Sequence, residues 1–248
     1  TTDVDYAPGH VLALEIQPQD MSILNKKNSK DAQNNGNWMR GPYTVSRATK
    51  HSFEILIRVV GDKSREFSNA KEGTPVKFGG KFKVPILEGI QTQDTERVVL
   101  VSTGTGVGPC VGAIEKALLY ESFPQIHLVA SYRTISDVIF DDYLEKLSQE
   151  NDDRFQYTRI ITSESGRLSD NDKNLDIIKS SLQLANTHYH LIGNGQMVNE
   201  WKEGLSHAGV PDDKITVEMY FNHKEQAKEG TIRRISDSIT ANVCDAVE

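Results

Sequence analysis

The stretch VVLVSTGTGVGP, residues 98–109, joins an apolar run to a glycine-rich turn and then to an expected helix. Its first four residues are apolar and rich in β-branched side chains, which is typical of a buried strand in a parallel sheet. The glycines at 104, 106 and 108 allow the backbone to approach a ligand, and Pro109 suits the first position of a helix. A helix N-terminus offers unpaired N–H groups and a partial positive charge, so we expect a dinucleotide pyrophosphate here. Strand-to-helix junctions also use glycine for steric reasons alone.

Composition bounds the class of protein. The chain has 248 residues, of which 37% are hydrophobic and 25% charged, and its formal net charge is −7. We expect one large or two ordinary domains, without membrane insertion, because no apolar run is long enough to span a bilayer. The negative charge argues against a nucleic-acid partner. With only Cys110 and Cys244, the chain predicts an intracellular, soluble protein, and an organelle such as a plastid remains open if a transit peptide was removed.

From residue 98 onward, strand and helix patterns alternate. Strands are predicted at 98–101, 126–131, 155–162, 188–193 and 215–221, and helices at 110–120, 136–149, 174–185 and 197–207, with Ser136 as the N-cap of the second helix. This alternation predicts a parallel sheet covered on both faces, whose ligands bind at the carboxyl ends of the strands.

Before residue 98 the pattern is all-β, with strands predicted at 11–16, 43–47, 53–60 and 74–78. A small antiparallel barrel or sandwich is the expected result, and the polar segment 25–37 is predicted to be a flexible insertion. We therefore predict domains at 1–96 and 97–223, followed by a C-terminal tail at 224–248. Apolar residues recur in the tail every three or four positions, so it is either a docking helix or disordered.

Four further segments accompany the glycine turn: PGHVLAL at 8–14, RGPYTVS at 40–46, GDKS at 61–64 and GNGQM at 193–197. Their order and spacing resemble those of the ferredoxin–NADP+ reductase superfamily of flavoproteins. The resemblance extends from about residue 6 to about residue 223. It implies a FAD-binding β-barrel followed by an NAD(P)-binding α/β domain.

The resemblance implies flavin contacts from the first half. The ring of Tyr43 would stack on the isoalloxazine, the Thr44 hydroxyl would reach flavin N5, and Arg40 would neutralise the pyrophosphate with donors added by the 61–64 turn. Strand residues on a pleated face and a solvated arginine are the alternatives. The implied flavin-binding residues are Arg40, Tyr43, Thr44, Val45, Lys63 and Ser64.

The second half supplies the implied nucleotide contacts. The turn at 103–109 would hold the pyrophosphate, while Ser131 and Arg133 follow the second strand, where a hydroxyl and a guanidinium suit a 2′-phosphate and favour NADP(H) over NAD(H). Arg167 is a second phosphate candidate, and both arginines are equally compatible with solvated strand ends. Phe221 either covers the flavin or is a core aromatic. The implied nucleotide residues are Thr103, Gly104, Thr105, Gly106, Pro109, Ser131, Arg133, Arg167, Gly193, Met197 and Phe221.

Three features depart from the family pattern. Arg40 stands three residues before Tyr43 rather than two, which puts its reach to the flavin phosphate in doubt. Ile192 occupies the position where the nicotinamide motif carries a cysteine beside the reacting carbon, so hydride transfer is expected to be slow or altered. The Pro-Gly strand comes almost at the start of the chain, so the barrel is open at that edge or is completed by the tail or by a partner chain.

The implied activity is that of a FAD-dependent NAD(P)H oxidoreductase, with Tyr43, Thr44 and Ile192 at the reaction centre. Hydride would pass from nicotinamide to flavin, and electrons would pass on to an acceptor such as ferredoxin or another electron-carrier protein. The alternative is a non-catalytic, reductase-like subunit with a structural or regulatory role in a larger assembly. The histidines show no metal-ligand spacing, and Cys110 is either an activated thiol at a helix start or a small core residue.

Overall fold

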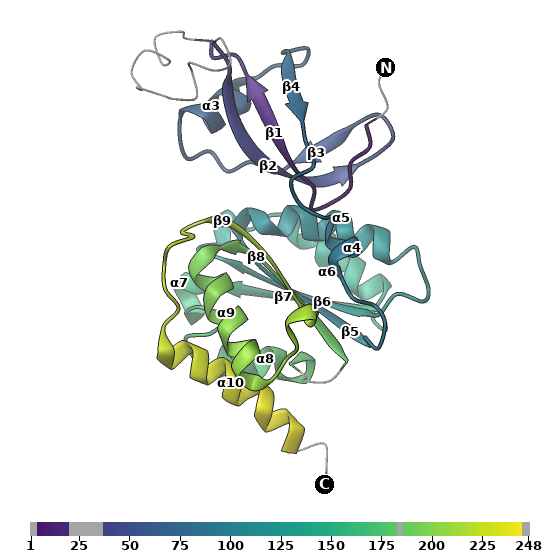
Figure 1. The fold of residues 1–248 in the computed structure, drawn as a ribbon, viewed down its shortest axis with the longest axis vertical. Coiled ribbons are helices and arrows are strands. Elements are labelled where there is room, and N and C mark those ends of the chain that lie inside the picture. The colour runs from purple at the N-terminus through teal and green to yellow at the C-terminus, as the bar shows by residue number, and fades with distance from the viewer. Residues whose placement is uncertain (1–3, 20–36, 183–185, 245–248) are drawn as a thin grey trace. The chain divides into compact units, whose positions relative to one another are not determined.

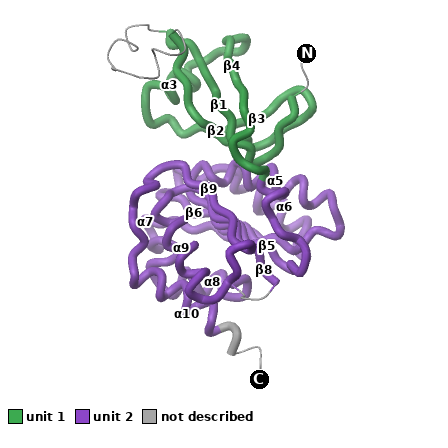
Figure 2. The backbone as a smooth tube through the Cα atoms, in the orientation of Figure 1, with its two compact units in different colours: residues 1–85 green, residues 86–248 purple. Residues whose placement is uncertain are grey.

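The computed structural model describes residues 4–19, 37–182 and 186–244. The polar insertion predicted at 25–37 lies outside these ranges except for its last residue. The chain forms two compact units, residues 1–85 and 86–248 (Figure 2).

The first unit contains an antiparallel sheet in the order β3-β2-β1-β4. Its elements are β1 (Val11–Ile16), β2 (Met39–Ala48), β3 (Phe53–Ile55), α3 (Asp62–Asn69) and β4 (Val76–Gly79). This sheet is half of a barrel and confirms the predicted antiparallel class. The strand predicted at 53–60 is too long, because pairing with β2 ends at Ile55, and Val59 and Val60 are exposed.

One face of this first sheet carries a small hydrophobic core. Leu12, Leu14 and Val45 are buried in it, and Tyr43 and Phe67 pack against it. Since side chains alternate between the faces of a strand, this core fixes which residues of β1 and β2 point inward.

The second unit is built on a five-stranded parallel sheet in the order β7-β6-β5-β8-β9 (Figure 1). Its strands are β5 (Arg97–Thr103), β6 (Gln125–Tyr132), β7 (Phe155–Ile161), β8 (Thr187–Asn194) and β9 (Ile215–Phe221). All five predicted strands are present, with ends moved by only a few residues. The direction of strand addition reverses between β5 and β8, which is where ligands bind in open parallel sheets.

Helices follow the strands as predicted, with several changed ends. They are α4 (Ile86–Gly89), η1 (Gly104–Gly106), α5 (Val107–Ala117), η2 (Ile135–Asp137), α6 (Asp141–Glu150), α7 (Thr162–Ser165), α8 (Asp172–Ile178), η3 (Lys179–Ser181), α9 (Gly195–Ala208), η4 (Asp212–Lys214) and α10 (Glu229–Cys244). Pro109 is the third residue of α5, still within the first turn, where N–H groups have no partner inside the helix. The helix predicted at 174–185 begins earlier and gives way to η3 after Ile178, and residues 183–185 lie outside the described ranges.

Ser136 is not a helix N-cap, so that prediction was wrong. Thr134 is the N-cap of η2 instead: its backbone N–H donates a hydrogen bond to the Asp137 carboxylate over 3.2 Å, and its hydroxyl donates to the same carboxylate over 2.9 Å. The chain then passes through Phe140, whose φ of 62° breaks the helical path before α6 begins. The local capping bonds of Thr134 therefore divide one predicted helix into two.

The tail forms a helix, α10, rather than a disordered segment. Ile232, Ile235 and Ile239 are buried, and Figure 1 shows α10 beside α9 and α8. A Cβ on Gly204 of α9 would lie 2.7 Å from the Ile235 side chain, so the glycine lets the two helices approach closely. Among the helices described, none is both long and apolar enough to cross a membrane.

Candidate functional site

The carboxyl ends of β5 and β8 meet at the switch point of the parallel sheet. The backbone N–H of Asn194 donates to the Thr103 hydroxyl over 2.8 Å. Gly193 has a φ of +126°, and a Cβ there would lie 2.2 Å from the same hydroxyl oxygen. Only glycine can occupy this position without moving Thr103, so the two strand ends are held in close contact.

The glycine turn forms η1 and leads directly into α5. A Cβ on Gly106 would lie 2.9 Å from the carbonyl oxygen of Ile192, so the turn packs tightly onto β8. Gly104 differs, because it has a φ of +55° and no heavy atom lies within 4 Å of the place its Cβ would take. The backbone at Gly104 is therefore open, and the first N–H groups of α5 follow it. This arrangement fits a pyrophosphate group.

The predicted active-site residue Ile192 lies beneath this turn. Its side chain is fully buried. Cys110 is also buried, and burial raises the pKa of its thiol, so it is a core residue rather than an activated thiolate. Glu218 was missed in the sequence: it is buried on β9 and pairs in register with Ile192. The available signal was a single charged residue in a strand whose other side chains are uncharged.

Ser131 and Arg133 lie at the same edge of the sheet. Ser131 is buried and pairs in register with Thr103, while the exposed Arg133 follows the end of β6. The Arg133 carbonyl accepts a hydrogen bond from Ser163 N–H over 3.0 Å, which ties the loops after β6 and β7 together. The structure thus brings the two residues to the edge that carries the glycine turn.

Arg167 joins this site through the GNGQM motif. Its guanidinium donates to Gln196 Oε1 over 2.8 Å, and Gln196 donates from Nε2 to Glu200 Oε1 over 3.0 Å. Glu200 is buried, and burial raises the pKa of its carboxyl. Gln196 and Glu200 were not predicted as site residues, because the bond that links Gln196 to Arg167 joins segments about 30 residues apart.

Two residues flank this network. Met197 is half-buried and packs against the core of the second unit. Phe221 ends β9 and is 48% exposed, and a Cβ on Gly195 would lie 2.8 Å from its carbonyl oxygen. Phe221 is therefore a surface aromatic at the carboxyl edge rather than a core residue.

In the first unit, β2 separates the predicted flavin residues onto two faces. Tyr43 packs beside Val45 on the apolar face, with its ring edge-on to Phe67 at a centroid distance of 5.3 Å. Arg40 is three positions from Tyr43 and so lies on the opposite face, where its Nε is 3.6 Å from Glu15 Oε1. Thr44 shares the face of Arg40. The extra residue between Arg40 and Tyr43 has therefore turned the arginine away from the tyrosine ring.

Lys63 lies beside Tyr43 instead. A Cβ on Gly41 would lie 3.1 Å from the Lys63 Nζ and 3.2 Å from the Tyr43 ring, so both side chains border the same open backbone. The Lys63 ammonium donates to the Arg40 carbonyl oxygen. Lys63 thus supplies a cation on the face that Arg40 does not reach.

The segment expected to be a turn at 61–64 is the start of α3. The Ser64 hydroxyl accepts hydrogen bonds from the N–H groups of Val60 and Gly61 over 2.9 and 3.0 Å, and it donates to the Gly61 carbonyl. Its hydrogen-bonding capacity is therefore used to hold the helix N-terminus.

Three histidines are buried in the second unit, in hydroxyl networks. His127 contacts Ser181 and Thr158, and His188 and His190 both contact the Thr216 hydroxyl. Burial lowers the pKa of His127 and of His188 to about 4, and that of His190 to about 3. Within the described ranges, no group of three or more potential ligands is arranged to hold a metal ion.

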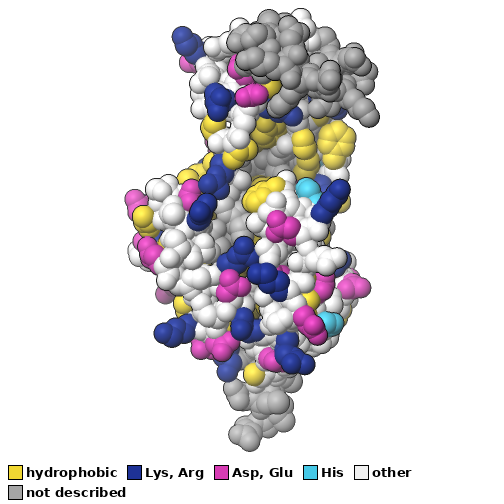
Figure 3. Space-filling view, turned by 90° about the vertical axis from the view of Figure 1, so that its left-hand side faces the viewer, with side chains coloured by type: hydrophobic (Ala, Val, Ile, Leu, Met, Phe, Trp, Pro, Cys, Tyr) yellow, Lys and Arg dark blue, Asp and Glu magenta, His cyan; other side chains and the backbone are white. Residues whose placement is uncertain are grey.

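The surface of the second unit is mixed in charge on the face shown in Figure 3. Lys and Arg side chains alternate with Asp and Glu across it. On this face, therefore, the net charge of −7 is not expressed as a single acidic field.

Comparisons with known proteins agree with this geometry. Residues 100–203 match the family described as oxidoreductase NAD-binding domain. No curated protein matches the chain.

Several solved structures share the fold over most of this chain. A ferredoxin NADP+ reductase from Neisseria gonorrhoeae with bound FAD and NADP is 20% identical, with a TM-score of 0.64, over 87% of each chain. The ferredoxin–NADP+ reductase from Plasmodium falciparum with 2′P-AMP is 14% identical, with a TM-score of 0.65, over 87% of this chain and 84% of that one. The flavohemoglobin from Malassezia yamatoensis, with bound FAD and heme, is 18% identical, with a TM-score of 0.66, and matches 87% of this chain. The match spans about half of the flavohemoglobin, 52% of its chain.

Proposed function

We propose that this chain is a member of the ferredoxin–NADP+ reductase-like superfamily and a FAD-dependent oxidoreductase that uses NAD(P)H, because residues 100–203 match an oxidoreductase NAD-binding domain and the fold is shared with such reductases. It takes hydride from the nicotinamide and passes electrons on to an acceptor. The observation that carries the proposal is the backbone cradle at the carboxyl ends of β5 and β8, where Gly193 is fixed against Thr103 and Gly104 is left open.

The chain's part in nucleotide binding follows from this cradle. The N–H groups at the start of α5 donate hydrogen bonds to the pyrophosphate oxygens, and the helix dipole favours the negative charge of the pyrophosphate. Thr103, Thr105 and the glycines of η1 border the phosphates, while Pro109 helps fix the first turn of the helix. Gly193 and Met197 keep α9 close to β5, so the nicotinamide end of the nucleotide lies near Phe221.

Ser131, Arg133 and Arg167 supply the preference for NADP(H). A 2′-phosphate is recognised best by hydroxyl and guanidinium donors, and the three residues lie around the ends of β6 and β7. In the reductase from Plasmodium falciparum a 2′P-AMP molecule is bound, which supports a 2′-phosphate site in this fold.

The flavin site uses Tyr43 and Lys63. When bound, FAD supplies an acceptor for the hydride and a donor of single electrons. Tyr43 offers an aromatic surface whose ring is braced by Phe67, and Lys63 places a positive charge beside it for the flavin pyrophosphate. Val45 anchors the strand in the core, and Ser64 fixes the start of α3. We assign Arg40 to an ion pair with Glu15 rather than to the flavin.

The acceptor is a one-electron carrier. Ferredoxin itself is usually acidic, and a net charge of −7 opposes a second acidic surface, so a less acidic carrier fits better. Catalysis of this kind rests on alignment and electrostatics, because hydride transfer needs no general acid or base from the protein.

A second candidate is a reductase-like subunit that binds the nucleotide without passing its hydride on. The orientation of Arg40 favours this second candidate. Arg40 is the residue expected to bind the flavin pyrophosphate, and it lies on the face of β2 opposite to Tyr43. The two candidates differ in whether FAD is held.

Reconstitution with FAD tests the proposal. After removal of free flavin, the purified chain is expected to keep a flavin absorbance band near one equivalent and to oxidise NADPH when an artificial one-electron acceptor is added. A chain that binds NADP+ but retains no FAD would favour the non-catalytic subunit. A chain that binds neither would overturn both candidates.

A further inference from the structure

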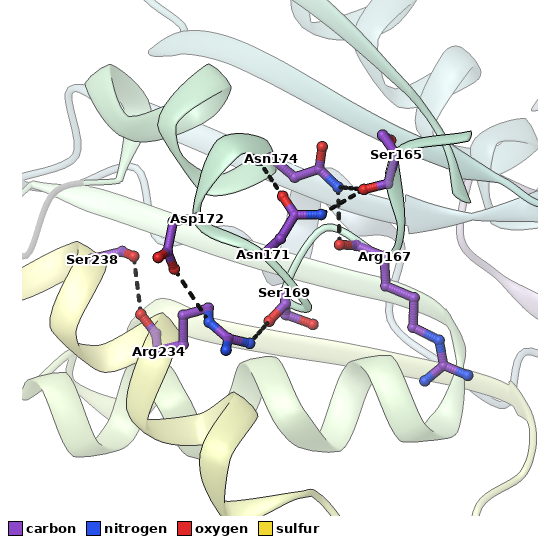
Figure 4. Close-up of polar contacts among 8 residues, drawn as sticks. All are labelled: Ser165, Arg167, Ser169, Asn171, Asp172, Asn174, Arg234 and Ser238. Atoms are coloured by element: carbon purple, nitrogen blue, oxygen red, sulfur yellow. Dashed lines mark hydrogen bonds and ion pairs between the residues drawn. The ribbon is translucent and has the colours of Figure 1, made fainter. Parts of the chain in front are cut away.

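The loop that carries Arg167 is held by side chains from α8. The Asn174 amide donates to the carbonyl oxygens of Ser165 and Arg167, each over 3.0 Å (Figure 4). It also donates to the Gly166 carbonyl oxygen over 3.1 Å. Asn174 is only 1% exposed, so these bonds form in a water-poor environment. Asn171 adds a further bond to the Ser165 carbonyl over 2.5 Å. The backbone beneath Arg167 is therefore fixed from one side.

The C-terminal helix holds the same loop from the other side. Arg234 of α10 donates from Nη1 to the Ser169 carbonyl over 3.1 Å, and its Nε lies 3.2 Å from Asp172 Oδ1, as Figure 4 shows. Asp172 begins α8, so one guanidinium joins the loop, α8 and α10. Because Asp172 is largely exposed, its ion pair with Arg234 contributes little, and we attribute most of the anchoring of the loop to the bond between Arg234 and the Ser169 carbonyl.

The C-terminal segment also lies close to Glu200, the last residue of the hydrogen-bond chain that begins at Arg167. Arg167 bonds to Gln196, and Gln196 bonds to Glu200. The backbone of Lys228, just before α10, acts on the Glu200 carboxyl and lowers its pKa, against the larger effect of burial, which raises it. The C-terminal segment therefore acts on both the loop that carries Arg167 and the Glu200 carboxylate, which is bonded to Gln196, the partner of Arg167.

We propose that Arg234 is a positioning residue for the nucleotide site: by anchoring the Ser169 carbonyl, it fixes the loop from which Arg167 meets the 2′-phosphate. The inference rests on the proposed function, since it assumes that Arg167 binds this phosphate. It makes the C-terminal helix a part of the determinant that separates NADP(H) from NAD(H). It also gives the helix a role beyond covering the apolar face of α9.

Binding of 2′,5′-ADP and of 5′-AMP to the full-length chain by calorimetry tests the proposal without need of flavin. The two ligands differ by the 2′-phosphate. Arg234→Met keeps the apolar stem and removes the donors, and we expect it to weaken 2′,5′-ADP binding about fivefold with 5′-AMP unchanged. Arg233→Met is the matched control, because Arg233 is the exposed neighbour on the same helix, and it should change neither affinity.

A double-mutant cycle with Arg167→Met shows whether Arg234 acts through Arg167. Arg167→Met alone should weaken 2′,5′-ADP binding about tenfold, and adding Arg234→Met should then weaken it no further. Arg234→Lys, which keeps one donor, should recover part of the loss and serves if the methionine variant unfolds. Equal losses from Arg234→Met with and without Arg167, or equal losses for both ligands, would overturn the proposal. An unchanged affinity in Arg167→Met would overturn it too, with nucleotide binding intact, whereas a wild-type chain that binds neither ligand would overturn the proposed function itself.

Discussion

The two units differ in how closely the positions of their binding residues agree with the prediction from the sequence. In the second unit, the residues predicted at strand ends lie together at the carboxyl edge of the sheet. In the first unit, Arg40 and Tyr43 lie on opposite faces of β2. In a parallel sheet, the residues that follow the strands lie at one edge, whichever face their side chains point to. In an antiparallel sheet, the binding residues must share one face. One added residue changes the face of a side chain but not the edge at which it lies.

The largest effect is expected from a substitution at Gly193, where β8 contacts Thr103 at the carboxyl edge of the parallel sheet. Gly193→Ala would place a methyl group 2.2 Å from the Thr103 hydroxyl oxygen, at a φ of +126°. We expect a loss of about 3 kcal/mol in the free energy of unfolding and the loss of NADP+ binding. Urea unfolding and calorimetry measure the two effects. Gly230→Ala is the control, because no heavy atom lies within 4 Å of its Cβ position, and binding of NADP+ by Gly193→Ala near wild-type affinity would refute the close contact.

Acid should destabilise the second unit through its three buried histidines. Their pKa values in the folded chain are lowered to about 4, 4 and 3, below the unfolded value of 6.5. As the pH falls below about 6.5, the unfolded chain takes up protons first, so the free energy of unfolding decreases until the folded pKa values are reached. Between pH 6.5 and 5.5 we expect a loss of about 3 kcal/mol.

Trp201 reports this change, because it is fully buried in the core of the second unit. With Trp38→Phe, it becomes the chain's sole tryptophan. Urea unfolding followed by Trp201 fluorescence should show a lower midpoint at pH 5 than at pH 7. Equal midpoints would show that the histidines protonate without resistance in the folded state.

Substitutions of Lys63 and Arg40 test which of these two cations of the first unit binds the flavin. Lys63→Met should weaken FAD binding about tenfold, because it removes the charge beside Tyr43, and Arg40→Met should change it less than about twofold. Quenching of flavin fluorescence measures both affinities. A larger loss from Arg40→Met than from Lys63→Met would mean that Arg40 reaches the flavin despite its place on the other face.

The smallest effect is expected at Ile192. Its side chain is fully buried, so Ile192→Cys leaves the surface of the site unchanged and removes core volume. We expect about 1 kcal/mol lower stability and a rate of flavin reduction by NADPH within about twofold of wild type. A tenfold faster reduction in stopped-flow absorbance would show that the missing cysteine had limited the reaction.

Local patterns were sufficient for the sheet of the second unit. Apolar runs ended by glycine or polar residues mark its strands, and the alternation with helices gives the parallel order. Local patterns also placed Thr103, Ser131 and Gly193, because residues that follow such strands lie at one edge.

What the sequence did not reveal depends on contacts between distant segments. Arg234 bonds to a carbonyl 65 residues away, and Lys63 bonds to one 23 residues away. The face on which Arg40 lies follows from the register of β1 with β2 rather than from a motif. The division of one predicted helix after Thr134 depends on the hydrogen bonds between Thr134 and the Asp137 carboxylate, which the helical pattern of residues 136–149 does not reveal.

The proposed function requires this chain to transfer hydride from NADPH to a flavin that it holds. Anaerobic mixing of the FAD-reconstituted, full-length chain with NADPH, followed by visible absorbance, tests it most directly. We predict that the flavin band bleaches in a single turnover, faster with NADPH than with NADH. A bound flavin whose absorbance is unchanged by either nucleotide would contradict the claim.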